Sequence, residues 1–298
     1  MIAYVGIATI HGPSGYRHPV YEGSYGRGAN LGYLISGGYV PHFRATNDRT
    51  WLEVTLHSGI TGWIRNDPAH VTVVLPDPNV VTICVDPGHG GTDNGARAFG
   101  LVEKDINFDV AFWKLYPKLA ADARIGRVWY TRNGDYDVSL RYRWDLANAS
   151  GCNLFLSVHT NWHPDPTVRG TETYFKCGSE ATDEQKERSQ RAACLIAGSV
   201  LSQIKQWGSV NCPPTDRGLI CRLLSREEPV SYYYVLENTH RPAVLLEMAY
   251  MSNRGEAYCL ASSIFRKFVA QGIYDGITAA LFTEQPGTEC RVSTMYSL

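Results

Sequence analysis

The 298-residue sequence lacks several features that would assign it to particular classes of protein. Its formal net charge is only −1, which gives no electrostatic reason to expect a nucleic acid or an anionic membrane as a partner. No apolar run approaches the ~20 residues of a membrane-spanning helix. The first 12 residues have neither a basic leader nor a clean apolar stretch, so we interpret them as a first strand and not as a signal peptide.

The eight cysteines include no CxxC pair, which argues against a cysteine zinc cluster. Four of them lie in apolar strand or helix patterns, where cysteine acts as a small hydrophobic residue: Cys84, Cys152, Cys194 and Cys259. The other four lie nearer to loops and are able to pair: Cys177, Cys212, Cys221 and Cys290. Because a chain of this size needs no disulfides to fold, we expect reduced thiols.

Residues 1–75 contain turn signals at short intervals, separated by short apolar and aromatic runs, and no convincing helix. Such spacing predicts a small all-β barrel or sandwich. The pattern W-x-x-V-x-x-x-x-G-x-x-G-W-I, from Trp51 to Ile64, resembles the closing half of a bacterial SH3-like domain. That resemblance implies a domain that binds wall peptide, and a packing or spacer role remains the alternative.

The sequence LPDPN makes residues 76–79 a short extended linker, and residues 80–298 then form a second domain. Strands are predicted at 80–86, 127–132, 154–160, 171–176 and 243–250. Helices are predicted from Glu103 onward, with a restart at Pro117, and over 138–150, 181–207 and 254–281. This alternation predicts an α/β fold with a mixed, mostly parallel sheet flanked by helices, preceded by the small all-β SH3-like barrel.

Four polar side chains lie at predicted strand ends or at a helix start. His89 follows the first strand of the second domain, Glu103 begins a helix, His159 closes the strand LFLSVHT, and Glu247 lies in the buried strand AVLLEMAY. Two histidines and a carboxylate form the ligand set of a catalytic Zn²⁺ site and leave a fourth position open for water. A second carboxylate is needed to carry the proton, and Glu247 has the required chemistry.

Each of these residues also has an ordinary structural interpretation. His89 in DPGHGG is compatible with a tight surface loop, and Glu103 with a helix-start carboxylate that faces the helix dipole. A histidine at a strand end, such as His159, is often a hydrogen-bonded core residue. Glu247 is harder to explain in this way, because an acidic residue in a buried strand needs a partner or a function.

Together, however, the motifs resemble one family, the zinc-dependent N-acetylmuramoyl-L-alanine amidases of the AmiC-like (amidase 3) type. The resemblance covers roughly residues 80–283 and rests on VDPGHGG-x-D-x-GA (85–96), G-x-x-EKD-x-N (100–107), LFLSVHTN (154–161), RGTETYF (169–175) and PAVLLEMAYMSN (242–253). It implies His89, Glu103 and His159 as zinc ligands and Glu247 as the catalytic carboxylate. It further implies hydrolysis of the amide bond between N-acetylmuramic acid and L-alanine of the peptidoglycan stem peptide.

Three further residues are candidates for substrate contact: Arg132 and Arg143, which match arginines of the family, and Asn161, which lies near the third ligand. Internal pairing is the alternative for both arginines, and closing of a turn is the alternative for Asn161. Glu172 is a second candidate proton carrier, for which a salt bridge on the strand face is the favoured role.

Two other functions remain open at this stage. One is a zinc carboxypeptidase or exopeptidase that acts on wall peptides, and the other is a non-catalytic wall-binding protein. We expect the chain to act at the cell wall, outside the cytoplasm. Without a recognisable leader, release by lysis or delivery by a phage particle, as for an endolysin, is the favoured route.

Overall fold

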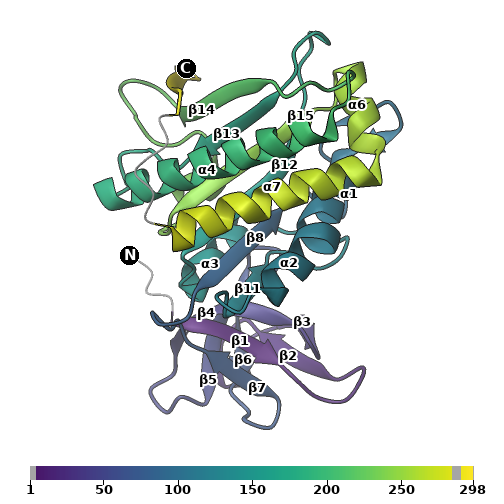
Figure 1. The fold of residues 1–298 in the computed structure, drawn as a ribbon. Helices are drawn as coiled ribbons and strands as arrows, with labels where there is room; N and C mark the ends of the chain where they lie inside the picture. The colour runs from purple at the N-terminus through teal and green to yellow at the C-terminus, as the bar shows by residue number, and fades with distance from the viewer. Residues whose placement is uncertain (1–4, 284–289, 298) are drawn as a thin grey trace. The chain divides into compact units, whose positions relative to one another are not determined.

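The structure is a computed structural model that describes residues 5–283 and 290–297. The chain divides into two compact units, one made of residues 1–80 and 138–152, the other of residues 81–137 and 153–298. Residues 138–152, which the sequence analysis assigned to the second domain, therefore cluster with the first unit. The two units are described separately below (Figure 1).

The N-terminal unit is built on a seven-stranded antiparallel sheet with the order β3-β2-β6-β5-β4-β1-β7. Its elements are β1 (Gly6–Ile10), β2 (Arg17–Tyr21), the 3₁₀ turn η1 (Ser24–Gly26), β3 (Asn30–Ile35), β4 (Tyr39–Ala45), β5 (Trp51–Thr55), β6 (Thr61–Arg65) and β7 (Val71–Val74). Strands β5 and β6 bury alternate residues, as expected for a sheet with one face toward a core. The predicted first strand begins at Gly6, and its first four residues lie outside the described part.

Helix α3 (Leu140–Ser150) completes this unit, and it packs against β1 and β4. Its N-terminus is capped by the Ser139 hydroxyl, which accepts a hydrogen bond from the Tyr142 amide. The Tyr142 hydroxyl in turn donates to the carbonyl of Tyr39 at 2.8 Å. The seven-stranded antiparallel sheet confirms the all-β part of the prediction for residues 1–75, whereas the SH3-like character of this domain stays a prediction.

The second unit contains another seven-stranded sheet, with the order β11-β8-β12-β15-β13-β14-β16. Its strands are β8 (Thr82–Pro87), β11 (Arg127–Tyr130), β12 (Leu154–Asn161), β13 (Thr171–Phe175), β14 (Asp216–Leu223), β15 (Ala243–Tyr250) and β16 (Val292–Tyr296). Every neighbouring pair is parallel except β13 and β15. The mixed, mostly parallel sheet is confirmed, but the sequence analysis did not predict strands β14 and β16.

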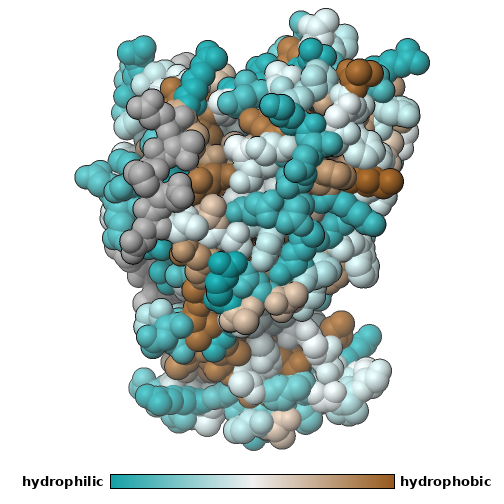
Figure 2. Space-filling model, in the orientation of Figure 1, coloured by the Kyte–Doolittle hydropathy of each residue, from teal (hydrophilic) through white to brown (hydrophobic). Residues whose placement is uncertain are grey.

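Helices cover this sheet, with α4 and α7 lying side by side across it in Figure 1. The remaining elements of the unit are the hairpin β9 (Arg97–Ala98) and β10 (Leu101–Val102), and the helices α1 (Glu103–Phe108), η2 (Asp109–Leu115), α2 (Tyr116–Ala121), α4 (Asp183–Trp207), α5 (Tyr234–Glu237), α6 (Arg254–Ala261) and α7 (Ser263–Phe282). Mainly hydrophilic and intermediate side chains cover the outer surface of α4 and α7 in Figure 2. This distribution fits amphipathic helices with one buried face.

Two predicted helices differ from the structure in detail. The helix that starts at Glu103 passes into the π-helical segment η2, whose wider turn places Leu115 in the core and leaves Trp113 65% exposed. Trp113 was predicted to lie on the apolar face with Ile106 and Val110, and that prediction is wrong. The helix predicted over 254–281 is two helices, because Ser262 caps the start of α7 through the amide of Phe265.

Successive side chains along the strands of the second unit point alternately to the two faces of the sheet. On β15, Val244, Leu246 and Met248 belong to the hydrophobic core that includes α4 and α7. The intervening residues, Leu245 and Glu247, must point to the opposite face, because successive side chains alternate across a strand. The opposite face of the sheet is therefore where polar chemistry can lie.

The expectation of reduced thiols is wrong for six of the eight cysteines. Disulfides join Cys177 to Cys221, Cys194 to Cys290, and Cys212 to Cys259. All three lie in the second unit and link positions 44 to 96 residues apart in the sequence. Cys84 and Cys152 are buried and take no part in these three bonds.

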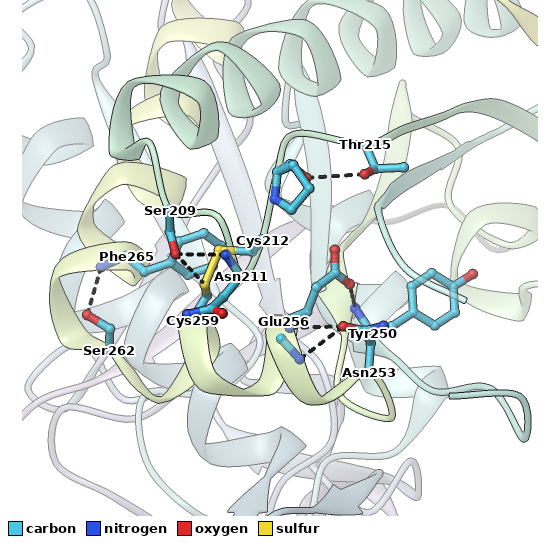
Figure 3. The surroundings of a disulfide bond; sticks show 12 residues. Ser209, Asn211, Cys212, Thr215, Tyr250, Asn253, Glu256, Cys259, Ser262 and Phe265 are labelled. Atoms are coloured by element: carbon cyan, nitrogen blue, oxygen red, sulfur yellow. Dashed lines mark hydrogen bonds between the residues drawn. A yellow bond between two sulfur atoms is a disulfide. The ribbon is translucent and has the colours of Figure 1, made fainter. Parts of the chain in front are cut away.

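The Cys212–Cys259 disulfide ties helix α6 to the segment that follows α4 (Figure 3). One turn earlier on α6, the carboxylate of Glu256 accepts hydrogen bonds from the amides of Tyr250 and Gly170, at 2.6 and 2.8 Å. Burial raises the pKa of Glu256, although these two amides favour its ionised form. The disulfide therefore anchors the helix that holds the end of β15 in place.

Over residues 5–283 and 290–297, none of the helices combines the length and the apolar character needed to cross a lipid bilayer.

We predict that the double substitution Cys194→Ser/Cys290→Ser lowers the free energy of unfolding by about 2–4 kcal/mol, because the unfolded chain loses a long covalent loop. Urea unfolding without reductant measures the difference. With reductant present, the variant and the native sequence should unfold at the same urea concentration. Equal stability of the two proteins without reductant would contradict this pairing.

Candidate active site

The first candidate ligand, His89, lies in the glycine-rich loop that follows β8. Its backbone has φ +60°, an uncommon conformation for a residue with a side chain. The preceding Gly88 has no room for a side chain, since a Cβ there would lie 2.2 Å from Cε1 of His159. The glycine thus allows the loop to approach the ring of His159 closely.

Glu103 begins helix α1 and is buried. Its Oε1 lies 3.1 Å from Nε2 of His89 and 3.0 Å from Nδ1 of His159. The amides of Ala96 and Thr160 donate to its carboxylate at 2.8 and 3.2 Å, which fixes its orientation. Burial opposes the ionised form, but the imidazoles of His159 and His89 hold the pKa of Glu103 well below its usual range.

One ligand atom from each of His89, Glu103 and His159 lies within 4.8 Å of the others. The structure thus brings together the three residues that the sequence analysis selected as ligands. Two imidazole nitrogens and a buried carboxylate oxygen are the donor set that suits Zn²⁺. The residues present therefore fit a divalent metal of this kind.

Asp93 contributes to this group although the sequence analysis did not select it. Its Oδ2 lies 2.8 Å from Nδ1 of His89. A carboxylate on one ring nitrogen orients the imidazole and leaves Nε2 for a metal. Burial disfavours the charged ring, but Glu103 and Asp93 outweigh it and raise the pKa of His89. The sequence signal that could have identified Asp93 was its position four residues after His89 in the same loop.

Glu247 lies in one row with His159 and Glu172 across three neighbouring strands. On β15 it is the register partner of His159 on β12 and of Glu172 on β13. Neighbouring strands are about 4.8 Å apart, so the three side chains emerge side by side on the face opposite the α4 core. The structure therefore places Glu247 next to the candidate metal ligands.

The carboxyl group of Glu247 differs from those around it. The residue is 7% exposed, and its Oε2 is buried without a hydrogen-bond partner among the described residues. Burial, with the charges of Glu103 and Glu172 adding to it, raises the pKa of Glu247 well above its usual range. A buried carboxyl with an unpartnered oxygen and a raised pKa is suited to proton transfer.

Glu172 has the opposite environment, although it lies in the same row. Its carboxylate accepts hydrogen bonds from four side chains: Arg217, Tyr250, Tyr174 at 2.7 Å and Asn161 at 3.0 Å. The ion pair with Arg217 agrees with the salt bridge that the sequence analysis favoured. These four donors hold the carboxylate in a fixed position, which favours a structural role for Glu172.

Arg132, a candidate for substrate contact, is 1% exposed. Its guanidinium donates to the carbonyls of Pro87, Gly88, Lys104 and Gly134 at 2.8–3.1 Å. These bonds hold the loop of His89 against the start of α1. This geometry favours a role in positioning the site over direct contact with substrate.

The other two candidates for substrate contact also have internal partners. The side-chain Nδ2 of Asn161 donates to Glu172, and its side-chain Oδ1 accepts from the backbone amide of Trp162 at 2.7 Å. Arg143 lies on α3 in the N-terminal unit and donates to the carbonyl of Val138 at 3.2 Å. A role for either residue in substrate binding stays a prediction.

The chain is similar in sequence and fold to several known proteins. Residues 83–279 match the Amidase_3 family, described as N-acetylmuramoyl-L-alanine amidase. The chain is 33% identical over 217 residues to N-acetylmuramoyl-L-alanine amidase LytC of Bacillus subtilis (strain 168), covering 72% of this chain and 39% of that protein. It is 31% identical over 199 residues to the endolysin of Bacillus phage SPP1, covering 67% of this chain and 65% of that protein. The chain therefore spans less than two thirds of either relative.

A solved structure of N-acetylmuramoyl-L-alanine amidase from Clostridium difficile 630 has a similar fold, with a TM-score of 0.58 at 28% identity. The similarity covers 70% of this chain and 100% of that chain. Since the family match extends over well more than half of the sequence, this chain belongs to the Amidase_3 family of N-acetylmuramoyl-L-alanine amidases.

Proposed function

We propose that this protein is a zinc-dependent peptidoglycan hydrolase that cleaves the amide bond between N-acetylmuramic acid and L-alanine of the stem peptide. The observation that carries the proposal is the convergence of His89, Glu103 and His159 beside the buried carboxyl of Glu247, within a chain of the amidase family. The named amidases among its relatives support the choice of bond.

His89, Glu103 and His159 would hold the zinc ion, with Asp93 orienting the ring of His89. When bound, zinc supplies Lewis-acid chemistry, which polarises a carbonyl and lowers the pKa of a water molecule toward ~7. The buried position of Glu103 and its two backbone donors keep its carboxylate in one orientation. The protein thus fixes the ligands before substrate arrives.

Glu247 would accept a proton from the attacking water and deliver it to the leaving amine of L-alanine. Its raised pKa supports this role, because a carboxyl that titrates nearer to neutrality can both take up and release a proton. Glu172, locked by Arg217 and two tyrosines, would contribute a fixed negative charge that helps to keep the pKa of Glu247 high.

The N-terminal unit would act as an SH3-like module that attaches the enzyme to the wall. An aromatic group with one exposed member supports this proposal. Tyr25 is exposed, and its ring centroid lies 6.4 Å from that of the half-buried Trp51, which is 5.8 Å from the ring centroid of the half-buried Tyr21. The three disulfides support action outside the cytoplasm, since such bonds persist in oxidising compartments. The endolysin among the relatives supports delivery at lysis.

Mass spectrometry of digested peptidoglycan tests the activity. The native enzyme should release stem peptides that begin at L-alanine, and Glu247→Gln should lower the rate by about 10²–10⁴-fold, because the proton carrier is lost. Its zinc content should stay unchanged, and the exposed control Glu187→Gln should be as active as the native enzyme. Shortened stems with intact lactyl–alanine bonds would instead identify a wall peptidase, and zinc-loaded native protein that cleaves no wall would favour a binding protein.

The substitution Asp93→Asn should weaken zinc binding by about 10–100-fold, because His89 loses the carboxylate that orients its ring. Competition with a chromogenic chelator measures the affinity. Asp105→Asn, at an exposed position on α1, is the matched control and should bind zinc as the native protein does. Unchanged affinity in Asp93→Asn would remove Asp93 from the site.

Wall attachment is tested in the inactive Glu247→Gln protein, so that the wall stays intact. Tyr25 is 52% exposed, and Tyr25→Ala should reduce co-sedimentation with purified cell walls several-fold, since an aromatic contact surface is lost. Tyr258→Ala, at a 67% exposed position in the other unit, should leave sedimentation unchanged. Equal sedimentation of both variants and their parent would support the spacer role.

A further inference from the structure

Arg222 lies on β14, the strand next to the edge strand β16, and is a half-buried cation with aromatic and hydroxyl partners. Its guanidinium carbon lies 3.8 Å from the centre of the Tyr232 ring and 5.7 Å from that of Tyr233. Its Nε donates to the hydroxyl of Ser297 at 3.0 Å, and its Nη1 to the hydroxyl of Tyr233 at 3.3 Å. Within residues 5–283 and 290–297, no acidic side chain forms an ion pair with it.

The surroundings of Arg222 are held in place before any ligand binds. The segment after β14 folds back on it, so that the amide of Tyr232 donates to the carbonyl of Arg222 at 2.9 Å, next to a bridge between Leu223 and Ser231. The neighbouring Cys221 is bonded to Cys177, just beyond the end of β13. A stacked guanidinium on a cross-linked hairpin loses little freedom when it binds a ligand.

Arg222 also lies on the same face of the sheet as Glu247. Tyr174 on β13 is the register partner of Ile220, and Arg222 follows Ile220 by two residues, so both point to the face of Tyr174. The ring of Tyr174 lies 4.8 Å from that of Tyr233, and its hydroxyl donates to Glu172, the neighbour of Glu247. Burial and the charge of Glu247 raise the pKa of Tyr233 to about 12, consistent with this proximity.

The spacing between the two positions matches a short peptide. Arg222 lies two strands and four residues away from Glu247 in the sheet, which corresponds to roughly 17 Å between Cα atoms at about 4.8 Å per strand and 3.4 Å per residue. An extended peptide that starts at the scissile bond covers this distance in about five residues. The distance between Glu247 and Arg222 therefore fits a ligand group on the same stem peptide whose first amide bond lies at Glu247.

We infer that Arg222, which lies over the ring of Tyr232 and near that of Tyr233, binds a carboxylate of the stem peptide beyond L-alanine. Guanidinium is the side chain best suited to a carboxylate, and its hydrogen-bond donors are only partly engaged by hydroxyl groups. The inference rests on the proposed amidase function and adds to it a preference for stems with free carboxylates over stems with amidated ones.

The test compares two synthetic muropeptides, one with free carboxylates beyond L-alanine and one with the same groups converted to amides. The native enzyme should cleave the free form with about a 10–100-fold higher kcat/KM, mainly through a lower KM, since the contact lies far from the reacting bond. Arg222→Gln should lose this preference while it cleaves the amidated form like the native enzyme. Arg222→Lys should retain part of it, since a charge remains without the planar fork.

Arg226→Gln is the matched control, because Arg226 lies on the same hairpin, packs over Tyr296 and is exposed. It should keep the full preference. Equal cleavage of the two substrates by the native enzyme, or an equal loss on both in Arg222→Gln, would overturn the inference and leave the proposed function intact. Failure of the native enzyme to cleave either substrate would overturn the proposed function, and the inference with it.

Discussion

The pairing register of β12, β15 and β13 is the constraint on which the site depends. Because side chains alternate across each strand, this register puts His159, Glu247 and Glu172 on one face and sends their neighbours into the core beneath α4 and α7. A shift of one residue in β15 would exchange Glu247 for Leu246 or Met248 and bury the carboxyl in the core. The apolar residues that stabilise the sheet therefore also fix the positions of the polar ones.

Two carboxyl groups in this row have contrasting environments, and the proposed mechanism assigns them different roles. The Glu172 carboxylate accepts four hydrogen bonds, whereas Glu247 has a raised pKa and a buried oxygen without a hydrogen-bond partner among the described residues. A fixed charge beside a group that can change its protonation is a common way to adjust proton transfer. In the proposed mechanism, the tyrosines and Arg217 around Glu172 would influence the reaction without contact with the reacting bond.

Much of this arrangement was predictable from the sequence, for identifiable reasons. His89, Glu103, His159 and Glu247 were selected because each lies at or near the end of an apolar strand or at a helix start, and the resemblance to the amidase family then implied their roles. Asp93 was visible in the same motif but was not selected, since its role depends on which nitrogen of His89 it faces. The burial of Arg132 could not be predicted, because it depends on loop carbonyls that come together only in the folded chain.

Other features could not be obtained from local sequence patterns. The disulfides join cysteines 44 to 96 residues apart, two of which (Cys194 and Cys259) lie in apolar patterns that resemble ordinary core positions. The exposure of Trp113 follows from one π-helical segment that an assumed α-helical period misses. The stacking of Arg222 on Tyr232 depends on a hairpin register that sequence spacing does not specify.

The most direct test of the central claim is anomalous X-ray diffraction from crystals of the zinc-loaded protein, recorded above and below the zinc absorption edge. The structure predicts a zinc peak bound by Nε2 of His89, Nδ1 of His159 and the Glu103 carboxylate, with Glu247 adjacent but not a ligand. A peak at other side chains, or direct coordination of the metal by Glu247, would contradict the assignment of ligands and proton carrier.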